Sequence, residues 1–281
     1  MSELFNLLWQ NQRPLMLTGF GFLVVTGILV SLTIVDSTQI LGINRWIKPI
    51  KFSSSAAMFL LTIAVYLVCL KDFEKSQNVI AWGTLLIMVG EVFLIILQSA
   101  RGTTSHYNVA RPFDGIVFAT MGLMILLNTF LIAYLAILYF RADFELPDAI
   151  IWGMRLGLIV FLLGSIQGGY MSSQTGHAIG TADGGSGLPF VNWSTTSGDL
   201  RVAHFLGLHA LQIIPLFAIA LVYLQTRISF IKPTALTVIF AALYFWAFTF
   251  VFLQALSGKP FIKAGNNKNT QTAASSQSEF V

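Results

Sequence analysis

The sequence predicts an all-α, polytopic membrane helix bundle with seven transmembrane helices, and three observations support this fold class. Of the 281 residues, 56% are hydrophobic and only 10% are charged, whereas soluble globular proteins carry about 25% charged residues. The mean hydropathy is +0.76. Several apolar runs are long enough to cross a hydrocarbon layer about 30 Å thick. The composition excludes a soluble domain and a disordered chain, and the net charge of +4 is too small to indicate nucleic-acid binding.

Seven apolar runs define a transmembrane domain over residues 1–264. The first run is too long for a signal-peptide core and no small-residue cleavage site follows it, so we expect it to be retained. The fifth run contains two pairs of glycines spaced for close helix packing, Gly153 with Gly157 and Gly164 with Gly168. The polar tail, 265–281, is predicted to be disordered. The spans are expected near residues 15–35, 52–70, 79–98, 113–139, 150–170, 203–225 and 233–256.

An odd number of spans places the chain ends on opposite membrane faces. Face A holds the N-terminus and the short loops 71–78, 140–149 and 226–232. Face B holds the longer and chemically more varied loops 36–51, 99–112 and 171–202. Functional residues concentrate on structured loops of a rigid scaffold, so we expect the site at face B. Basic residues are denser in the short loops, which predicts a cytoplasmic N-terminus and an extracytoplasmic face B.

Polar residues inside the spans follow helical stripes. The third span carries Thr84, Glu91 and Gln98 at intervals of seven, so the three share one face of the helix. The fourth span carries Asp114 and Asn128 on a similar stripe. Ionisable groups inside a membrane are expensive and are functional candidates by default. These stripes therefore predict a polar pocket within the bundle.

The sixth span brings a second set of polar groups to the same depth. Arg201 precedes it, and His204, His209 and Gln212 lie within it. Glu91 and His209 each lie roughly 10 Å inside face B, at about 1.5 Å per helical residue. We expect these two side chains to face each other across a pocket open to face B. The alternative is an isolated, protonated Glu91 that bonds a backbone carbonyl.

All four histidines of the chain fall at or just below face B. Imidazoles together with a carboxylate from Glu91, Asp114 or Asp199 would suit Zn²⁺ or Fe, and a pair of imidazoles would suit haem b. His204 and His209 are five residues apart, so one helix cannot easily direct both at one ion. The alternative is that these side chains only cap helices and bridge loops. The candidate ligands are His106, His177, His204 and His209.

The face B loops supply further candidates. Asp183 is followed by glycines that could form an anion-binding nest or direct the carboxylate at a cation, although a cap of tight turns is the favoured interpretation. Ser197 is expected to cap the sixth span, and Asp199, which suits the positive end of that helix, is expected to pair with Arg201. Basic residues of loops 36–51 and 99–112 form a cationic rim that suits an anionic or lipid headgroup; alternatively they only contact lipid phosphates. The rim comprises Arg45, Lys48, Lys51, Arg101 and Arg111.

Two resemblances bear on this interpretation. The stretch 176–212, with SHYN at 105–108 and NRWIKPIKF at 44–52, resembles a set of bacterial multi-pass membrane proteins over most of the chain. That resemblance implies a bacterial inner membrane and no particular activity. Seven-helix zinc hydrolases related to adiponectin receptors are similar in span count and in a histidine–carboxylate site inside one face. Their histidines are spaced HxxxH, whereas this chain has HxxxxH.

The sequence thus favours a metal- or haem-dependent membrane enzyme, redox or hydrolytic, acting on an anionic or lipid-like substrate. In this hypothesis the histidines are ligands, and Glu91 donates or accepts a proton. Asp114 and Asp199 are the other candidate catalytic carboxylates. The alternative is a proton-coupled transporter or a ligand sensor without chemistry. The candidate ligand-binding residues are Gln98, Arg101, Asn108, Asp183, Arg201 and Gln212.

Overall fold

A computed structural model describes residues 2–184 and 187–263, and it confirms the all-α seven-helix bundle. The chain is an integral multi-pass membrane protein. The predicted spans and the helices differ by up to five residues, at the starts of the second and third spans, because these helices begin with polar turns that the apolar runs omit. The predicted disorder of the tail lies outside the described residues. The long helices are α2 (Arg13–Val35), α3 (Ile47–Val68), α4 (Glu74–Ala100), α5 (Pro112–Arg141), α6 (Asp148–Ser173), α7 (Leu200–Gln225) and α8 (Pro233–Leu256).

Short elements flank these helices. They contain too few residues for a periodic pattern of apolar side chains to be recognised in the sequence. A helix, α1 (Ser2–Asn11), precedes the first span. The antiparallel strands β1 (Gln39–Ile40) and β2 (Ile43–Asn44) are joined by a two-residue turn. Both turn residues have positive φ, 51° at Leu41 and 79° at Gly42, as a tight hairpin requires. In loop 174–199, β3 (Ala178–Ile179) pairs with β4 (Gly198–Asp199), with Ala178 opposite Asp199.

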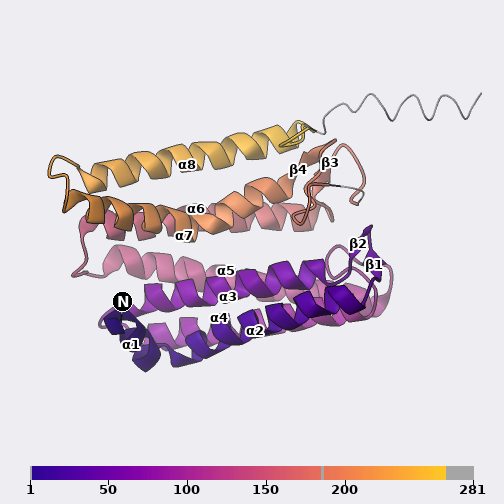
Figure 1. The fold of residues 1–281 in the computed structure, drawn as a ribbon, viewed down its shortest axis with the longest axis horizontal. Helices are drawn as coiled ribbons and strands as arrows, with labels where there is room; N and C mark the ends of the chain where they lie inside the picture. Colours follow the sequence, from indigo (N-terminus) through magenta and orange to yellow (C-terminus); the bar gives the residue numbers. More distant parts are fainter. Residues whose placement is uncertain (1, 185–186, 264–281) are drawn as a thin grey trace, which may run out of the picture.

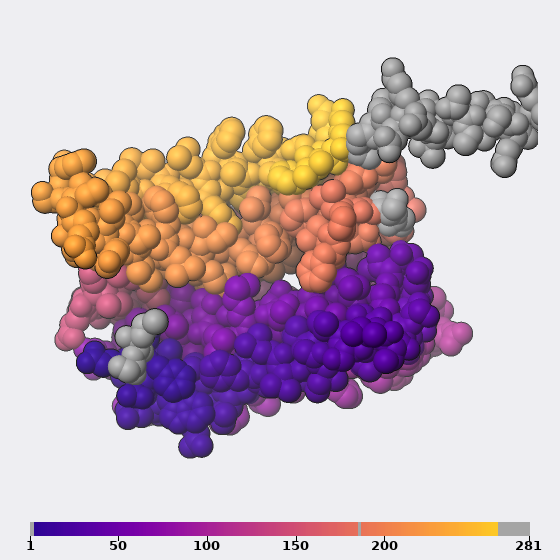
Figure 2. Space-filling view, viewed as in Figure 1, coloured from indigo at the N-terminus to yellow at the C-terminus, as the bar shows by residue number. Residues whose placement is uncertain are grey.

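The helices lie in two layers, with α2 to α5 in one and α6 to α8 in the other (Figure 1). The strands β1 to β4 gather at one end of the bundle, opposite α1 (Figure 1). This end is face B, where the sequence predicted the longer loops to meet. In the space-filling view the two layers meet along a seam (Figure 2). Residues far apart in the sequence are therefore brought together at the face B end of this seam.

Close packing of α6 on α7 fixes the side of α7 that faces the rest of the bundle. A Cβ atom on Gly164 would lie 2.8 Å from the Cα atom of Gly207, and one on Gly157 would lie 2.9 Å from the Ala210 carbonyl oxygen. Both distances are too short for any side chain. The glycine pairs of the fifth span thus act as predicted, by allowing two helix backbones to approach closely.

Two buried tyrosines form a chain of hydrogen bonds nearer face A, and the first of these bonds joins the two layers. The Tyr66 hydroxyl donates to the Leu211 carbonyl at 2.9 Å, and the Tyr139 hydroxyl donates to the Tyr66 carbonyl at 2.8 Å. Their side chains are fully buried, with 1% and 0% exposure. These aromatic rings belong to the main apolar core, which fills the bundle interior toward face A. The polar groups of the interior are consequently concentrated nearer face B.

Candidate functional site

The Asp199 carboxylate accepts the hydrogen bonds that hold the start of α7. Its Oδ1 accepts from the backbone N–H of Arg201 at 3.0 Å, which caps the helix, and from Arg201 Nε at 2.9 Å. Its Oδ2 accepts from Ser194 N at 2.8 Å and from Arg201 Nη2 at 2.6 Å. Burial alone would raise the pKa of Asp199, but the Arg201 guanidinium and the Ser194 amide hold it below its usual range. The helix is thus capped by Asp199 rather than by the predicted Ser197, because α7 begins at Leu200. The predicted pair with Arg201 is present, and a catalytic role for Asp199 stays a prediction.

Cations from the two layers converge on one loop. Lys51 of α3 donates to the Val191 carbonyl at 3.4 Å, and Arg201 of α7 donates to the adjacent Asn192 carbonyl at 2.5 Å. Lys48 lies one turn before Lys51, and its ammonium group is 5.7 Å from the centre of the Phe52 ring. We refer to Lys48, Lys51 and Arg201 as the cationic centre. Among the described residues, neither lysine forms an ion pair with a carboxylate.

The rest of the predicted cationic rim is largely neutralised. Arg45 forms an ion pair with Asp36, whose pKa is held far below its usual range by hydrogen bonds from Thr38, Trp46 and Arg45. Arg101 forms an ion pair with Asp114 at 2.6 Å.

The Gln98 amide completes this pair by donating to Asp114 at 3.0 Å and accepting from Arg101. Arg101 is paired with Asp114 and Gln98, and its predicted role in holding an anionic group stays a prediction. It links α4 to α5 in the observed state.

An aromatic box surrounds His106. Its ring centre lies 5.5 Å from that of Phe52, 6.1 Å from Tyr107 and 6.4 Å from Phe118. Tyr107 adopts a positive φ of 58°, an uncommon conformation for a non-glycine residue. Burial lowers the pKa of His106 well below its usual value, and the nearby charge of Lys48 lowers it further. His106 is therefore neutral at physiological pH and lies beside the cationic centre.

His177 lies between this box and the start of α7. Its ring centre is 6.5 Å from that of Tyr107, and its Nδ1 is 3.5 Å from Asp183 Oδ1 and 3.7 Å from Asp199 Oδ1. Burial and the charges of Arg201 and Lys48 lower the pKa of His177 despite the two carboxylates. The imidazole is therefore a neutral polar group in this cluster.

Asp183 orders its own loop. Its carboxylate accepts from the backbone amides of His177, at 3.0 Å, and Ala178, at 2.8 Å. This arrangement agrees with the favoured cap of tight turns. The remainder of the proposed glycine nest includes residues 185–186, which lie outside the described residues.

Asn108 has a similar role in loop 99–112. Its side-chain amide donates to Thr103 Oγ1 and to the Thr104 carbonyl. Its side-chain oxygen accepts from the Ala110 amide. Asn108 therefore folds the loop that carries His106, and its predicted ligand-binding role stays a prediction.

Glu91 and His209 are not joined by a hydrogen bond. His209 Nδ1 donates to the Phe205 carbonyl at 2.8 Å, and its ring lies 3.9 Å from the ring of Phe205. Glu91 is 4% exposed, and its Oε1 has no hydrogen-bond partner among the described residues. That the two side chains face each other across a pocket therefore stays a prediction, and Glu91 Oε1 does not bond a backbone carbonyl of the described residues.

The two remaining α7 candidates point in different directions. His204 Nδ1 donates to the Gly164 carbonyl at 2.9 Å, and its ring lies over Gly168. Gln212 donates to Thr62 Oγ1 of α3 at 3.1 Å, across the seam between the layers. His204 therefore faces α6, whereas Gln212 bridges the two layers.

No group of three or more His, Cys, Asp or Glu side chains arranged for a metal ion is found in residues 2–184 and 187–263. Comparison of the chain with protein-family models, with curated proteins and with solved structures finds no significant match. The geometry of the site is thus the basis for assigning a function.

Sequence reasoning missed the aromatic box and the role of loop 188–193. Tyr107 and Phe118 gave no signal because aromatic residues are common in membrane spans and at their ends. The carbonyls of Val191 and Asn192 belong to the backbone, so no residue type in the sequence indicated their role. The two lysines within the motif at 44–52 and the candidate Arg201 were the signals that pointed to the cationic centre.

Proposed function

We propose that the protein binds the anionic headgroup of a lipid-like substrate at the cationic centre. The observation that carries this proposal is the convergence of Lys48, Lys51 and Arg201 from two helix layers at one end of the bundle. The Arg201 charge is paired with Asp199, whereas Lys48 and Lys51 have no carboxylate partner among the described residues, so an anion relieves the repulsion between these two lysines. His106 and Tyr107 supply polar groups beside the same position.

The membrane position of the site supports a lipid-like ligand. Lys51 lies at the face B end of a transmembrane helix, where lipid headgroups lie. We also propose a bacterial inner-membrane location with a cytoplasmic N-terminus, which places this site on the extracytoplasmic side. The density of basic residues in the short face A loops supports this orientation.

Replacement of Lys51 tests the proposed headgroup site. We expect Lys51→Gln to weaken binding of oleoyl lysophosphatidate by about tenfold, because a hydrogen bond to a charged group is lost. Binding to the purified protein in detergent would be measured with radiolabelled ligand. The matched control is Lys259→Gln, which removes the same charge from an exposed lysine at the same face, outside the cationic rim.

Two results would contradict the headgroup site. One is equal loss of affinity in the Lys51→Gln and Lys259→Gln variants, which would indicate a general surface-charge effect. The other is equal affinity of the wild-type protein for oleoyl lysophosphatidate and for the zwitterionic oleoyl lysophosphatidylcholine. Either result would mean that the cationic centre does not recognise an anion.

A second candidate function is a haem- or metal-dependent enzyme, redox or hydrolytic. His204 favours it, because a histidine whose Nδ1–H is held by a carbonyl presents Nε2 as a ligand. We expect purified protein to contain near-stoichiometric Fe or Zn, with a Soret band if the group is haem. An absorption spectrum and elemental analysis of one sample test this. Absence of both signals would leave headgroup binding without a metal centre.

A further inference from the structure

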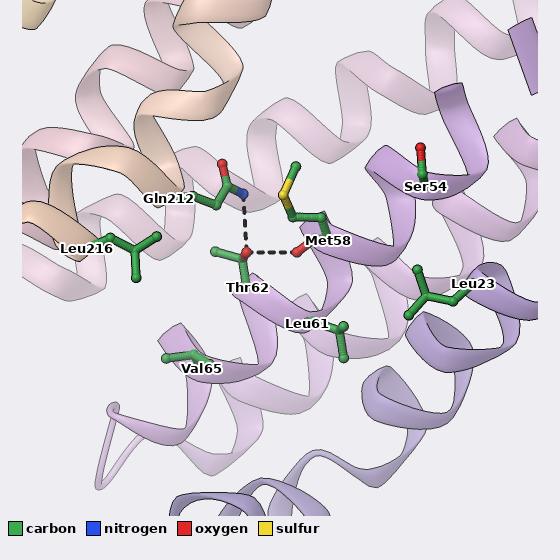
Figure 3. A pocket seen from close by; sticks show the side chains of 8 residues that line it. All are labelled: Leu23, Ser54, Met58, Leu61, Thr62, Val65, Gln212 and Leu216. Carbon is green, nitrogen blue, oxygen red and sulfur yellow. Dashed lines mark hydrogen bonds between the residues drawn. The ribbon is translucent and has the colours of Figure 1, made fainter. Parts of the chain in front are cut away.

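A groove runs along the seam between the two layers, next to the cationic centre. It has a volume of about 430 Å³ and lies between α3 and α7, with one contribution from α2. Gln212 reaches across it to Thr62, which in turn donates to the Met58 carbonyl at 2.7 Å (Figure 3). Apart from these polar groups and Ser54, its walls are apolar. The groove is large enough for a small ligand, at the lower end of the usual range of about 300–1,000 Å³.

The groove and the cationic centre occupy the same faces of their helices. On α3, Ser54, Met58 and Val65 follow Lys51 at intervals of three, seven and fourteen residues, which is one helical stripe. On α7, Gln212 lies eleven residues after Arg201, a rotation of only about 20° from it. On α3 the lining begins at Ser54, one turn from Lys51, and on α7 it begins at Gln212, on the same side of the helix as Arg201.

The groove is open on the side that faces lipid. Leu216 is 62% exposed and Met58 is 39% exposed, so both present apolar surface outside the bundle. The groove lining on α3 runs from Ser54 to Val65, and Val65 lies about 21 Å from Lys51 along the helix axis, at about 1.5 Å per residue. This distance passes the middle of a hydrocarbon layer about 30 Å thick. A lipid of the face B leaflet has this same arrangement, with its headgroup at the surface and its chain directed inward.

We infer that this groove takes a single hydrocarbon chain of the substrate whose anionic headgroup lies at the cationic centre. The inference rests on the proposed function and adds the substrate class, a single-chain anionic amphiphile that enters sideways from the bilayer. Charge complementarity at one end and apolar walls along the rest argue for this occupant. The limited volume argues for one chain rather than two.

Filling the groove tests the inference. We expect Leu216→Trp to weaken binding of oleoyl lysophosphatidate by about tenfold, since the displaced chain loses the burial of roughly two methylene groups. The matched control is Leu243→Trp on α8, because Leu243 is 61% exposed and lies outside the groove. Glycerol phosphate, which has the same headgroup and no chain, competes for the headgroup site and is measured with each variant.

The expected result is that Leu216→Trp weakens only the chain-bearing ligand and Leu243→Trp weakens neither. If the wild-type protein binds glycerol phosphate and oleoyl lysophosphatidate equally well, the groove takes no chain, while the headgroup site stands. If both tryptophan variants lose affinity equally, the groove is likewise excluded. If neither ligand binds, the proposed function fails and the inference fails with it.

Discussion

Replacement of Asp199 by Asn is expected to lower the free energy of unfolding by about 3–5 kcal/mol, the usual effect of breaking a buried ion pair from one side. The Asp199 side chain is completely buried and accepts four hydrogen bonds. Asn at this position presents one oxygen and one NH₂ group, so it cannot satisfy both Arg201 and Ser194. Arg201 would then remain beside Lys51 without its carboxylate. Chemical denaturation in mild detergent would measure the loss.

Asp183→Asn is the matched control for Asp199→Asn. Asp183 belongs to the same loop, but its side chain is 25% exposed and it accepts from backbone amides that an Asn oxygen can still serve. We expect its effect to be about 1 kcal/mol. If both substitutions cost the same, the Asp199–Arg201 pair does not organise this end of the bundle.

The pKa of Asp199 adds a pH dependence to this prediction. Its folded-state pKa lies below the ordinary value of 3.8. Its stabilising contribution is therefore present at neutral pH and is lost as the pH falls below that value. The Asp199→Asn variant lacks this acid-induced loss.

The seven helices could be predicted because the bilayer fixes both their length and their apolar character. The partners of most polar groups inside the bundle could not, although the Asp199–Arg201 pair was predicted. Counting residues gave Glu91 and His209 a common depth, but depth says nothing about which helices are neighbours. In the structure α4 packs chiefly on α3 and α5, whereas α7 packs on α6 and α8. His209 instead bonds the carbonyl one turn earlier in its own helix.

The charge pairs of the cationic rim could not be predicted from the sequence either. Residue types predicted an excess of positive charge at face B, but ion pairs depend on how each loop folds. The β1–β2 turn brings Asp36 to Arg45, and loop 101–111 brings Asp114 to Arg101. What remains without a carboxylate partner in the described residues is the lysine pair on α3, Lys48 and Lys51. Sequence alone could not separate these two residues from the neutralised arginines.

Replacement of Glu91 by Met is expected to raise the stability of the protein by about 1–3 kcal/mol, the usual cost of a buried polar group without a partner. Glu91 is 4% exposed, and its Oε1 has no hydrogen-bond partner in the described part of the chain. Met has a similar length and fills irregular apolar space. Thermal and chemical unfolding of the purified variant in detergent would measure the gain.

Gln98→Met is expected to have the opposite effect on stability, although Gln98 lies on the same stripe of α4 as Glu91. Gln98 is fully buried, donates to Asp114 and accepts from Arg101, so its replacement is expected to cost about 1–3 kcal/mol. A loss of stability in Glu91→Met as large as that in Gln98→Met would show that the carboxyl is satisfied and structural. If Glu91→Met instead gains stability and binds oleoyl lysophosphatidate more weakly, Glu91 is a functional residue that lowers the stability of the protein, as functional residues often do.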